Sequence, residues 1–356
     1  LNRGEWSRFM LQFLIEWPHP IIRQYLETGQ SPQSTLSITI PKTPEVMRKM
    51  QNVFDIRINK KAKFSPSALN YYLDCPLKFY YIYVAELSAP EQVSAEIDSA
   101  TFGSIFHLAA ENIYKDLTAH NNVIDKETLE ALLHNEVKLQ DYVDVAFKEL
   151  FFNVSQDEKP EYNGVQLINS AVISRYLKQL LENDLRYTPF TFVGSEQPVD
   201  IEIKTPKGII KSRIGGIIDR LDSKDGTLRI VDYKTGGDAD TPPNVESLFT
   251  PAKKRSNYVF QTFLYAAIMC RKQPLKVAPS LLYIHRAATE TYSPVIQMGE
   301  SRKPKEPVED FSIYETEFRE RLQVLLEDIF NPEIPFTQTE IVEKCTYCDF
   351  KTLCKR

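Results

Sequence analysis

The spacing of apolar residues from Ser65 onward predicts helices in the first half of the chain. Ser65-Pro66 can start a helix, because serine caps a first turn and proline fits its first position. The apolar residues from Ala68 to Leu73 then recur at helical spacing. The same pattern predicts further helices at about 103–114, in two or three pieces over 125–190, at 257–269 and at 314–329.

The pattern then changes to that of strands. Val199–Ile203 alternates between apolar and polar positions, as a half-buried strand does. The β-rich runs Ile209–Ile218 and Leu228–Tyr233 are separated by Asp225-Gly226, a pair that is typical of hairpin turns. Ser280–Ile284 is a short apolar run that predicts one more strand.

This order of elements predicts an α/β fold, in which a central mixed β-sheet is flanked by helices and carries a helical insertion at about 115–190. Residues 63–356 are expected to form this domain. Residues 1–62 follow a different pattern, and we interpret them as an N-terminal connector. They contain an amphipathic stretch, a loop and a short strand, at Trp6–Leu26, Gly29–Pro32 and Ser37–Pro41. Because the first residue is leucine rather than methionine, we expect the chain to be a piece of a larger protein.

Composition and charge limit the classes of function. The chain is 42% apolar and 11% aromatic, which supports a packed core, and its net charge of −5 argues against broad, non-specific coating of nucleic acid. Basic clusters at Lys60–Lys63 and Lys253–Arg255 could line a local groove or be ordinary solvated lysines. With no signal peptide, no apolar run of membrane length and five cysteines, the chain is expected to be cytoplasmic, in a reducing compartment.

Two neighbouring strands bring acidic residues together near their ends. Asp232 and Lys234 are two residues apart, so both side chains project from one face of a strand, and Asp219 can approach them from the strand before. Carboxylates suit Mg²⁺ or Mn²⁺, and such a metal activates water and neutralises charge on a phosphodiester. Lys234 could hold that water or stabilise the transition state. A surface hairpin with solvated charges is the alternative, weakened by the apolar run before Asp232 and the glycines before Asp219.

The same two segments resemble the paired motifs of the PD-(D/E)xK nuclease superfamily, especially the nuclease domains of the RecBCD and AddAB recombination enzymes. Four further segments match that branch in the same order along the chain. They are Ser65–Leu69 with Cys75-Pro76 and Phe79–Tyr81, then Phe102–His107, then Gln261–Tyr265, and finally Cys345–Phe350 ending at Cys354. The resemblance covers about residues 63–356.

The resemblance implies a restriction-endonuclease-like core and roles for three more residues. It makes His107 a candidate third metal ligand beside Asp219 and Asp232, although a lone histidine on a helix is often a partly buried core residue. Gln261 and Tyr265 share a helix face, which by itself suggests a half-buried pair in the core. The resemblance instead implies that they are catalytic residues, which line the active-site cleft and contact the scissile strand or order the lysine. Glu111 lies one helical turn after His107 and is a weaker candidate for the metal site. A glutamate near Glu196 occurs in related nucleases, but its spacing here is too loose for an assignment.

Four of the cysteines form a candidate metal site. Cys345, Cys348 and Cys354 are close in sequence, and Cys75 is the obvious fourth ligand, whereas Cys270 lies in an apolar helical stretch and reads as a plain buried thiol. Four thiolates fit Zn²⁺ or an iron–sulfur cluster, and base rate favours zinc. The resemblance implies a [4Fe–4S] cluster instead, because four-cysteine members of this branch carry one.

The residues predict a divalent-metal site, and the resemblance implies a metal-dependent deoxyribonuclease, with DNA as substrate, in DNA end processing and double-strand-break repair. The resemblance implies a helicase subunit, or an upstream helicase-like region, as partner, because the chain itself has no Walker-type phosphate loop. A non-catalytic DNA-binding scaffold of the same fold remains open, although the joint presence of Asp219, Asp232, Lys234 and His107 argues against it. A stand-alone exonuclease similar to the CRISPR-associated group that shares these motifs is the other alternative.

Overall fold

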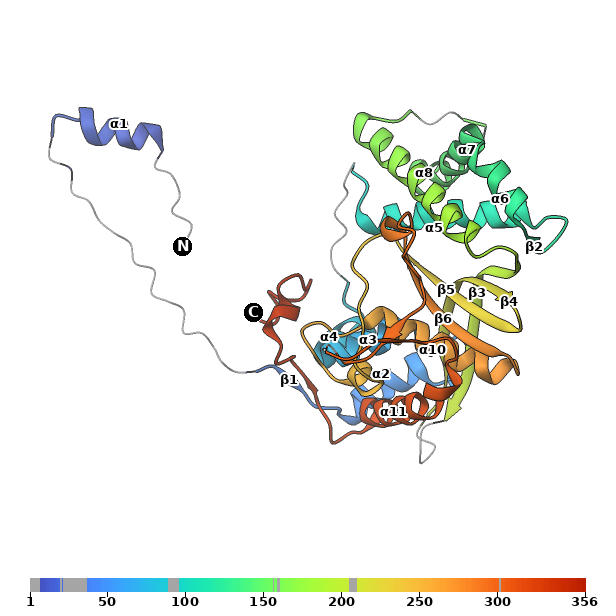
Figure 1. Ribbon diagram of the computed structural model, residues 1–356. Helices are drawn as coiled ribbons and strands as arrows, with labels where there is room; N and C mark the ends of the chain where they lie inside the picture. The colour runs from blue at the N-terminus through green and yellow to red at the C-terminus, as the bar shows by residue number, and fades with distance from the viewer. Residues whose placement is uncertain are drawn as a thin grey trace. The chain divides into compact units, whose positions relative to one another are not determined.

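The computed structural model describes residues 7–19, 21, 37–88, 96–155, 157–158, 161–204, 210–300 and 302–356 (Figure 1). The chain divides into two compact units, Leu1–Leu36 and Ser37–Arg356. In the first unit, helix α1 (Arg8–Glu16) buries none of its residues, and Phe9 and Ile15 are about four-fifths exposed. The expected loop Gly29–Pro32 lies outside the described residues.

The second unit is built on a five-stranded mixed sheet in the order β2-β3-β4-β5-β6. The first three pairings are antiparallel, and β5 and β6 are parallel. The strands are β2 (Val123–Ile124), β3 (Phe190–Lys204), β4 (Lys211–Lys224), β5 (Thr227–Lys234) and β6 (Lys276–Tyr283). Strand β5 lies between β4 and β6 and has a core on each face, so its residues are buried continuously from Leu228 to Tyr233, including Arg229 and Asp232.

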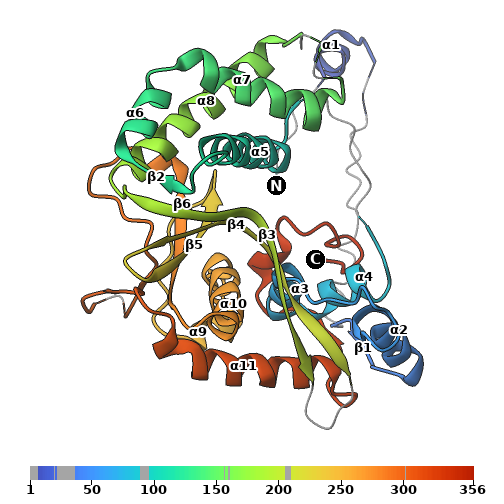
Figure 2. The ribbon, with the colours of Figure 1, turned by 90° about the vertical axis from the view of Figure 1, so that its right-hand side faces the viewer.

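One face of the sheet is covered by the helices that follow the opening segment (Figure 2). They are α5 (Ser99–Leu117), α6 (Lys126–Leu133), α7 (Glu136–Phe147), the π-helix η1 (Lys148–Phe152) and α8 (Gly164–Leu185). Asp98 caps α5 by accepting from the Thr101 amide, and an asparagine–glutamine capping box starts α8. Their apolar residues form one core with Val231, Tyr233 and Leu282 of the sheet. The sheet therefore holds α5, which carries His107, against β5.

The opposite face packs against a second core, which includes the centre of α10 and the sheet residues Ile218, Ile230 and Leu281. The helices on this side are α2 (Pro44–Phe54), α3 (Pro66–Asp74), α4 (Pro76–Tyr83), α9 (Glu246–Phe249), α10 (Asn257–Lys272) and α11 (Ser312–Phe330). The remaining elements are β1 (Thr39–Ile40), η3 (Ile284–Arg286), β7 (Gln297–Met298), β8 (Glu306–Pro307), β9 (Phe336–Thr337) and η4 (Val342–Cys345).

Residues 37–62 pack within the second unit rather than apart from it. Strand β1 pairs with β9 near the other end of the chain, and Phe54 of α2 stacks on Phe64 with ring centroids 3.9 Å apart. The buried Lys42 ammonium donates to the Asp328 and Asn331 carbonyls at the end of α11. The expected short strand at Ser37–Pro41 is present, but α2 was not foreseen.

The predicted α/β fold, with its mixed central sheet, flanking helices and helical insertion, is confirmed. Helices α6, α7 and α8 occupy the expected insertion at about 115–190. Within the described part of the chain, we find no helix with the length and apolar character that crossing a bilayer requires.

Candidate active site

The hairpin of β4 and β5 places the two aspartates side by side. Asp225 and Gly226 both have positive φ values, 50° and 76°, which is the geometry of the tight turn that the sequence predicts. From this turn the strands pair as far as Arg220 and Val231. At the next residue of β4, a side chain replaces the backbone carbonyl as the hydrogen-bond acceptor. Asp219 Oδ2 accepts a 2.7 Å hydrogen bond from the Tyr233 amide. This bond fixes the Asp219 side chain at the edge of β5.

A backbone irregularity on the other side of β4 brings Glu196 to the same place. Glu196 has φ 46°, a left-handed conformation that is unfavourable for a residue with a side chain. Ser195 pairs with Arg220 and Gln197 with Ile218, but the pair between them, Glu196 opposite Asp219, is missing from the ladder. The strain in the backbone is thus located where two carboxylates meet.

His107 reaches these carboxylates from α5. Its Nδ1 lies 3.6 Å from Asp219 Oδ2 and 3.8 Å from Glu196 Oε1, and its side chain is 27% exposed. Among the described residues, His107, Glu196 and Asp219 are the one group of three or more potential ligands whose donor atoms all lie within 4.8 Å of one another. One nitrogen and carboxylate oxygens suit a divalent cation such as Mn²⁺ or Mg²⁺. These side chains therefore fit a metal ion.

Asp232 and Lys234 form an ion pair beside this group. Lys234 Nζ lies 2.6 Å from Asp232 Oδ2, and its ammonium sits 4.3 Å from the centre of the Tyr258 ring. Gln261 of α10 donates through Nε2 to the other Asp232 oxygen at 3.0 Å and to the Tyr265 hydroxyl at 3.4 Å. The predicted pair on α10 therefore orients Asp232.

Tyr265 is buried behind Gln261 and depends on a glycine. A Cβ atom on Gly216 would lie 2.5 Å from the Tyr265 hydroxyl oxygen, so the absence of a side chain at this position of β4 makes room for the phenol. Gly216, one of the glycines before Asp219, is therefore needed for the close packing of β4 against α10.

Burial and crowded charges set the protonation of these groups. Burial, followed by the charge of Asp232, raises the pKa of Asp219 from 3.8 to about 7. Burial alone would lower the pKa of His107, but Asp219 and its neighbouring carboxylates outweigh it and raise that pKa. Burial also opposes the charge on Lys234, yet Asp232 and Asp219 raise its pKa above 10.5. Lys234 is therefore a cation at neutral pH, suited to stabilising negative charge.

We expect Asp219 to destabilise the metal-free protein at neutral and alkaline pH. Since its pKa is raised in the fold, its contribution to the free energy of unfolding falls as pH rises from about 4 to about 7. Asp219→Asn, which keeps an oxygen for the Tyr233 amide, should raise Tm at pH 8 in EDTA by roughly 3 °C and have little effect at pH 4.5. Thermal unfolding of both proteins at the two pH values checks this, and an equal shift at both would contradict it.

A cleft of about 760 Å³ opens over the group. Its lining includes His107, Glu196, Lys234 and Tyr258, and also Glu111. Glu111 shares the face of His107, as its spacing suggested, but it is paired with Lys115 at 2.6 Å. Asp219 and Asp232 lie just beneath this lining, in contact with His107 and Lys234, which belong to it. Gln261 and Tyr265 are also absent from the lining, so the expectation that they line the cleft is not met, and Gln261 contacts Asp232 from behind.

The structure thus brings together the residues that the sequence singled out, and it adds Glu196. His107 faces a cleft instead of lying within the core, which favours the site reading over the packing alternative. Asp232 lies next to the three-residue group and is held by Lys234 and Gln261. The cluster at Lys253–Arg255 is not a basic strip, because Arg255 is buried and Lys253 pairs with Glu343.

The four predicted cysteine ligands line a second, smaller cavity of about 90 Å³. Cys75 stands at the junction of α3 and α4, and Cys345, Cys348 and Cys354 come from the C-terminal tail. None of them forms a disulfide. Burial, and then the neighbouring Cys75, raises the pKa of Cys345. A cationic centre in the cavity would reverse this effect, because it binds thiolates.

The comparison with protein families found a match over most of the chain. The model of the PD-(D/E)XK nuclease superfamily matches residues 63–355, and the chain belongs to that superfamily. Among curated proteins, no significant match was found.

Proposed function

We propose that this chain is a metal-dependent deoxyribonuclease whose cleft holds Mg²⁺ or Mn²⁺ between His107, Glu196 and Asp219. The observation that carries the proposal is the juxtaposition of this three-residue group with the Asp232–Lys234 ion pair at one cleft. Membership of the nuclease superfamily supports phosphodiester hydrolysis as the reaction.

Each side chain has a distinct task in this proposal. The metal, when bound, lowers the pKa of a water and neutralises charge on the phosphodiester. Lys234 is held by Asp232 and presents a fixed positive charge to the attacking water or to the developing phosphate charge. Gln261 and Tyr265 keep Asp232 oriented, so that the ammonium stays at one position.

The proposal is tested by incubating end-labelled linear DNA and circular DNA with Mg²⁺, Mn²⁺ or EDTA. We expect cleavage with either metal and none in EDTA, and loss of label from linear DNA before circular DNA is cut would indicate an exonuclease. A protein that binds DNA but leaves it intact with both metals would be the scaffold alternative.

His107→Ala should lower cleavage and raise the metal concentration needed for half-maximal activity by roughly 10- to 100-fold, because it removes one ligand from an otherwise intact group. His134→Ala, which changes an exposed histidine on the helical insertion, is the matched control. Metal titrations of both variants give the result. A large drop in Tm with unchanged activity per folded molecule would make His107 a structural residue.

We also propose a [4Fe–4S] cluster at the cysteine cavity. Tetrahedral zinc with Zn–S bonds of about 2.3 Å would bring the sulfurs to roughly 3.8 Å of one another. Among the described residues, no set of three cysteine sulfurs lies within 4.8 Å of one another. The wider spacing of four thiols around one cavity favours a multi-iron cluster over a single zinc ion.

A role in DNA end processing and double-strand-break repair, with a helicase subunit or an upstream helicase-like region as partner, follows from the resemblance of the motifs to the RecBCD and AddAB nuclease domains. The division of the chain into a connector at 1–62 and a nuclease domain at 63–356 stays a prediction. The packing of α2 against Phe64 favours a boundary before residue 37.

A further inference from the structure

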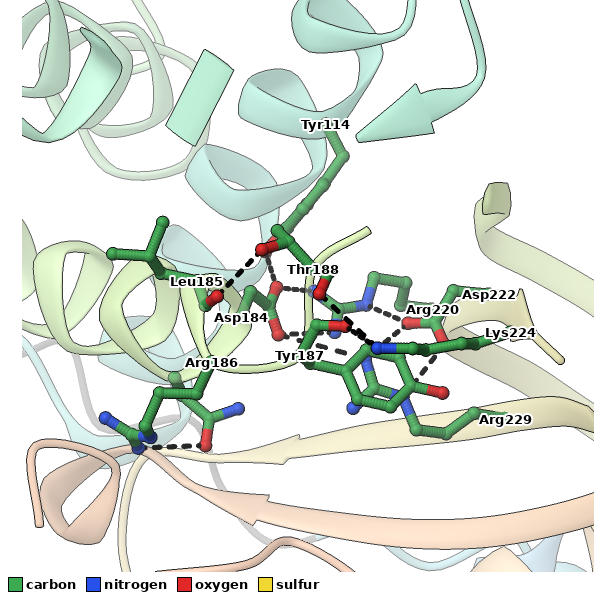
Figure 3. A network of polar contacts seen from close by, with 11 residues as sticks. Tyr114, Asp184, Leu185, Arg186, Tyr187, Thr188, Arg220, Asp222, Lys224 and Arg229 are labelled. Carbon is green, nitrogen blue, oxygen red and sulfur yellow. Dashed lines mark hydrogen bonds and ion pairs between the residues drawn. The ribbon is translucent and has the colours of Figure 1, made fainter. Parts of the chain in front are cut away.

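A buried network of charges lies between helices α5 and α8 and strands β4 and β5 (Figure 3). Arg220, the residue after Asp219, is fully buried, as are Asp184 at the end of α8 and Asp222 on β4. Arg220 makes a two-pronged contact with Asp184, one bond of which measures 2.9 Å, and its Nε lies 3.1 Å from Asp222 Oδ2. Arg229 of β5 binds Asp222 through two hydrogen bonds of 2.8 and 2.7 Å.

The network extends to α5 through Tyr114. The Tyr114 hydroxyl donates to Asp184 Oδ2, and the Arg220 guanidinium lies 4.7 Å from the centre of the Tyr114 ring and 5.6 Å from that of Tyr233. Burial would raise the pKa of Asp184, but Arg220 outweighs it and lowers that pKa, so the carboxylate stays charged. Two arginines thus face two aspartates with no net charge.

The position of the network in the fold links it to the metal-binding group. Tyr114 and His107 are seven residues apart on α5 and share a helix face. Arg220 and Asp219 are neighbours on β4. Helix α5 and strand β4 are therefore joined twice, at the cleft by His107 and Asp219 and in the interior by Tyr114, Asp184 and Arg220.

Stability alone does not account for such a network. Buried ion pairs often stabilise a fold no better than apolar residues of similar size, and their best attested use is to fix one arrangement of the elements they join. Apolar packing between α5 and the sheet would tolerate small shifts, whereas the fork of Arg220 admits one geometry. A shift of about 1 Å would separate His107 from Asp219.

We infer that Arg220, Asp184 and Tyr114 are positioning residues, which set the distance between α5 and β4 and thereby assemble the His107–Glu196–Asp219 group. The inference deepens the proposed function and rests on it for the role of that group. It assigns to the helical insertion, through Asp184, a direct part in the geometry of the cleft.

The test replaces the whole set at once by Tyr114→Phe, Asp184→Leu and Arg220→Met, so that no buried polar group of the three is left without a partner. The Arg229–Asp222 pair remains neutral in this variant. We expect a folded protein with a Tm close to that of the wild type. The Tyr233 amide, which donates to Asp219, should exchange with deuterium at least tenfold faster, and Mn²⁺ should bind at least tenfold more weakly.

The matched control is Glu202→Gln with Lys211→Met, which removes an exposed ion pair between β3 and β4 and should change neither readout. A folded triple variant with wild-type Tyr233 exchange and Mn²⁺ affinity would overturn the inference. If the triple variant does not fold, Tyr114→Phe alone decides, and unchanged Tyr233 exchange in that variant would equally overturn it. A wild-type protein that binds no Mn²⁺ would refute the proposed function, while the exchange of Tyr233 would still decide the positioning role.

Discussion

Replacing Asp232 by asparagine, or Lys234 by alanine, is expected to reduce DNA cleavage by roughly 10²- to 10³-fold or more, while the protein still folds. Lys234 Nζ lies 2.6 Å from Asp232, and this carboxylate raises the pKa of Lys234, so Asp232 keeps the lysine in its charged form. Asparagine at position 232 keeps the oxygen that accepts from Gln261 but removes the negative charge that fixes the lysine.

Two controls separate this effect from general damage. Asp141→Ala on α7 and Lys253→Ala both remove an exposed charge elsewhere and should cleave at wild-type rates. Single-turnover cleavage, with Tm measured for every variant, makes the comparison. Wild-type cleavage rates in either Asp232→Asn or Lys234→Ala would contradict the assignment of these residues to the active site.

Replacing Cys348 by alanine should give the largest loss of stability. Cys75 and Cys345 are 270 residues apart in sequence, so a shared centre ties α3 and α4 to the tail. By analogy with a disulfide, closing so long a loop contributes on the order of 5 kcal/mol at most. The variant should lose iron and brown colour and unfold at a clearly lower temperature. Cys270→Ala should keep its iron, its colour and its unfolding temperature, because Cys270 is a half-buried thiol on α10.

Metal and sulfide analysis of anaerobically purified protein gives the outcome. Near-stoichiometric zinc without iron or sulfide would refute the cluster and leave the metal link between the helices and the tail. Absence of any metal, together with unchanged stability of Cys348→Ala, would refute both. The cavity is separate from the cleft lining that contains His107 and Lys234, so the cluster is expected to act through structure rather than in hydrolysis.

The hairpin and its residues could be predicted from the sequence because their signals are local. Asp225-Gly226 fixes the turn, and the two-residue spacing of Asp232 and Lys234 fixes their common face. The tail was harder to read. Its packing was not predicted: Phe350 packs on Tyr81 with ring centroids 5.3 Å apart and gives the tail an apolar contact with α4.

Glu196 and Asp184 could not be assigned from the sequence because their roles depend on long-range register. Glu196 reaches the cleft through one strained residue and one missing strand pair, neither of which leaves a pattern in composition. Asp184 sits on α8, 36 residues from the arginine that it binds. Helix α2 did carry a local signal, since Thr43 caps it before a proline and Met50 and Phe54 share its buried face.

The central claim is that one divalent ion, held by His107, Glu196 and Asp219, serves the cleavage reaction. Anomalous diffraction from crystals soaked in Mn²⁺ tests it most directly, because the manganese signal locates the ion without assumptions about the reaction. We predict a peak bounded by these three side chains, lost in Asp219→Asn, in a protein that cleaves DNA with Mn²⁺. Metal-dependent cleavage together with a manganese peak elsewhere in the cleft, or with none at this group, would contradict the account.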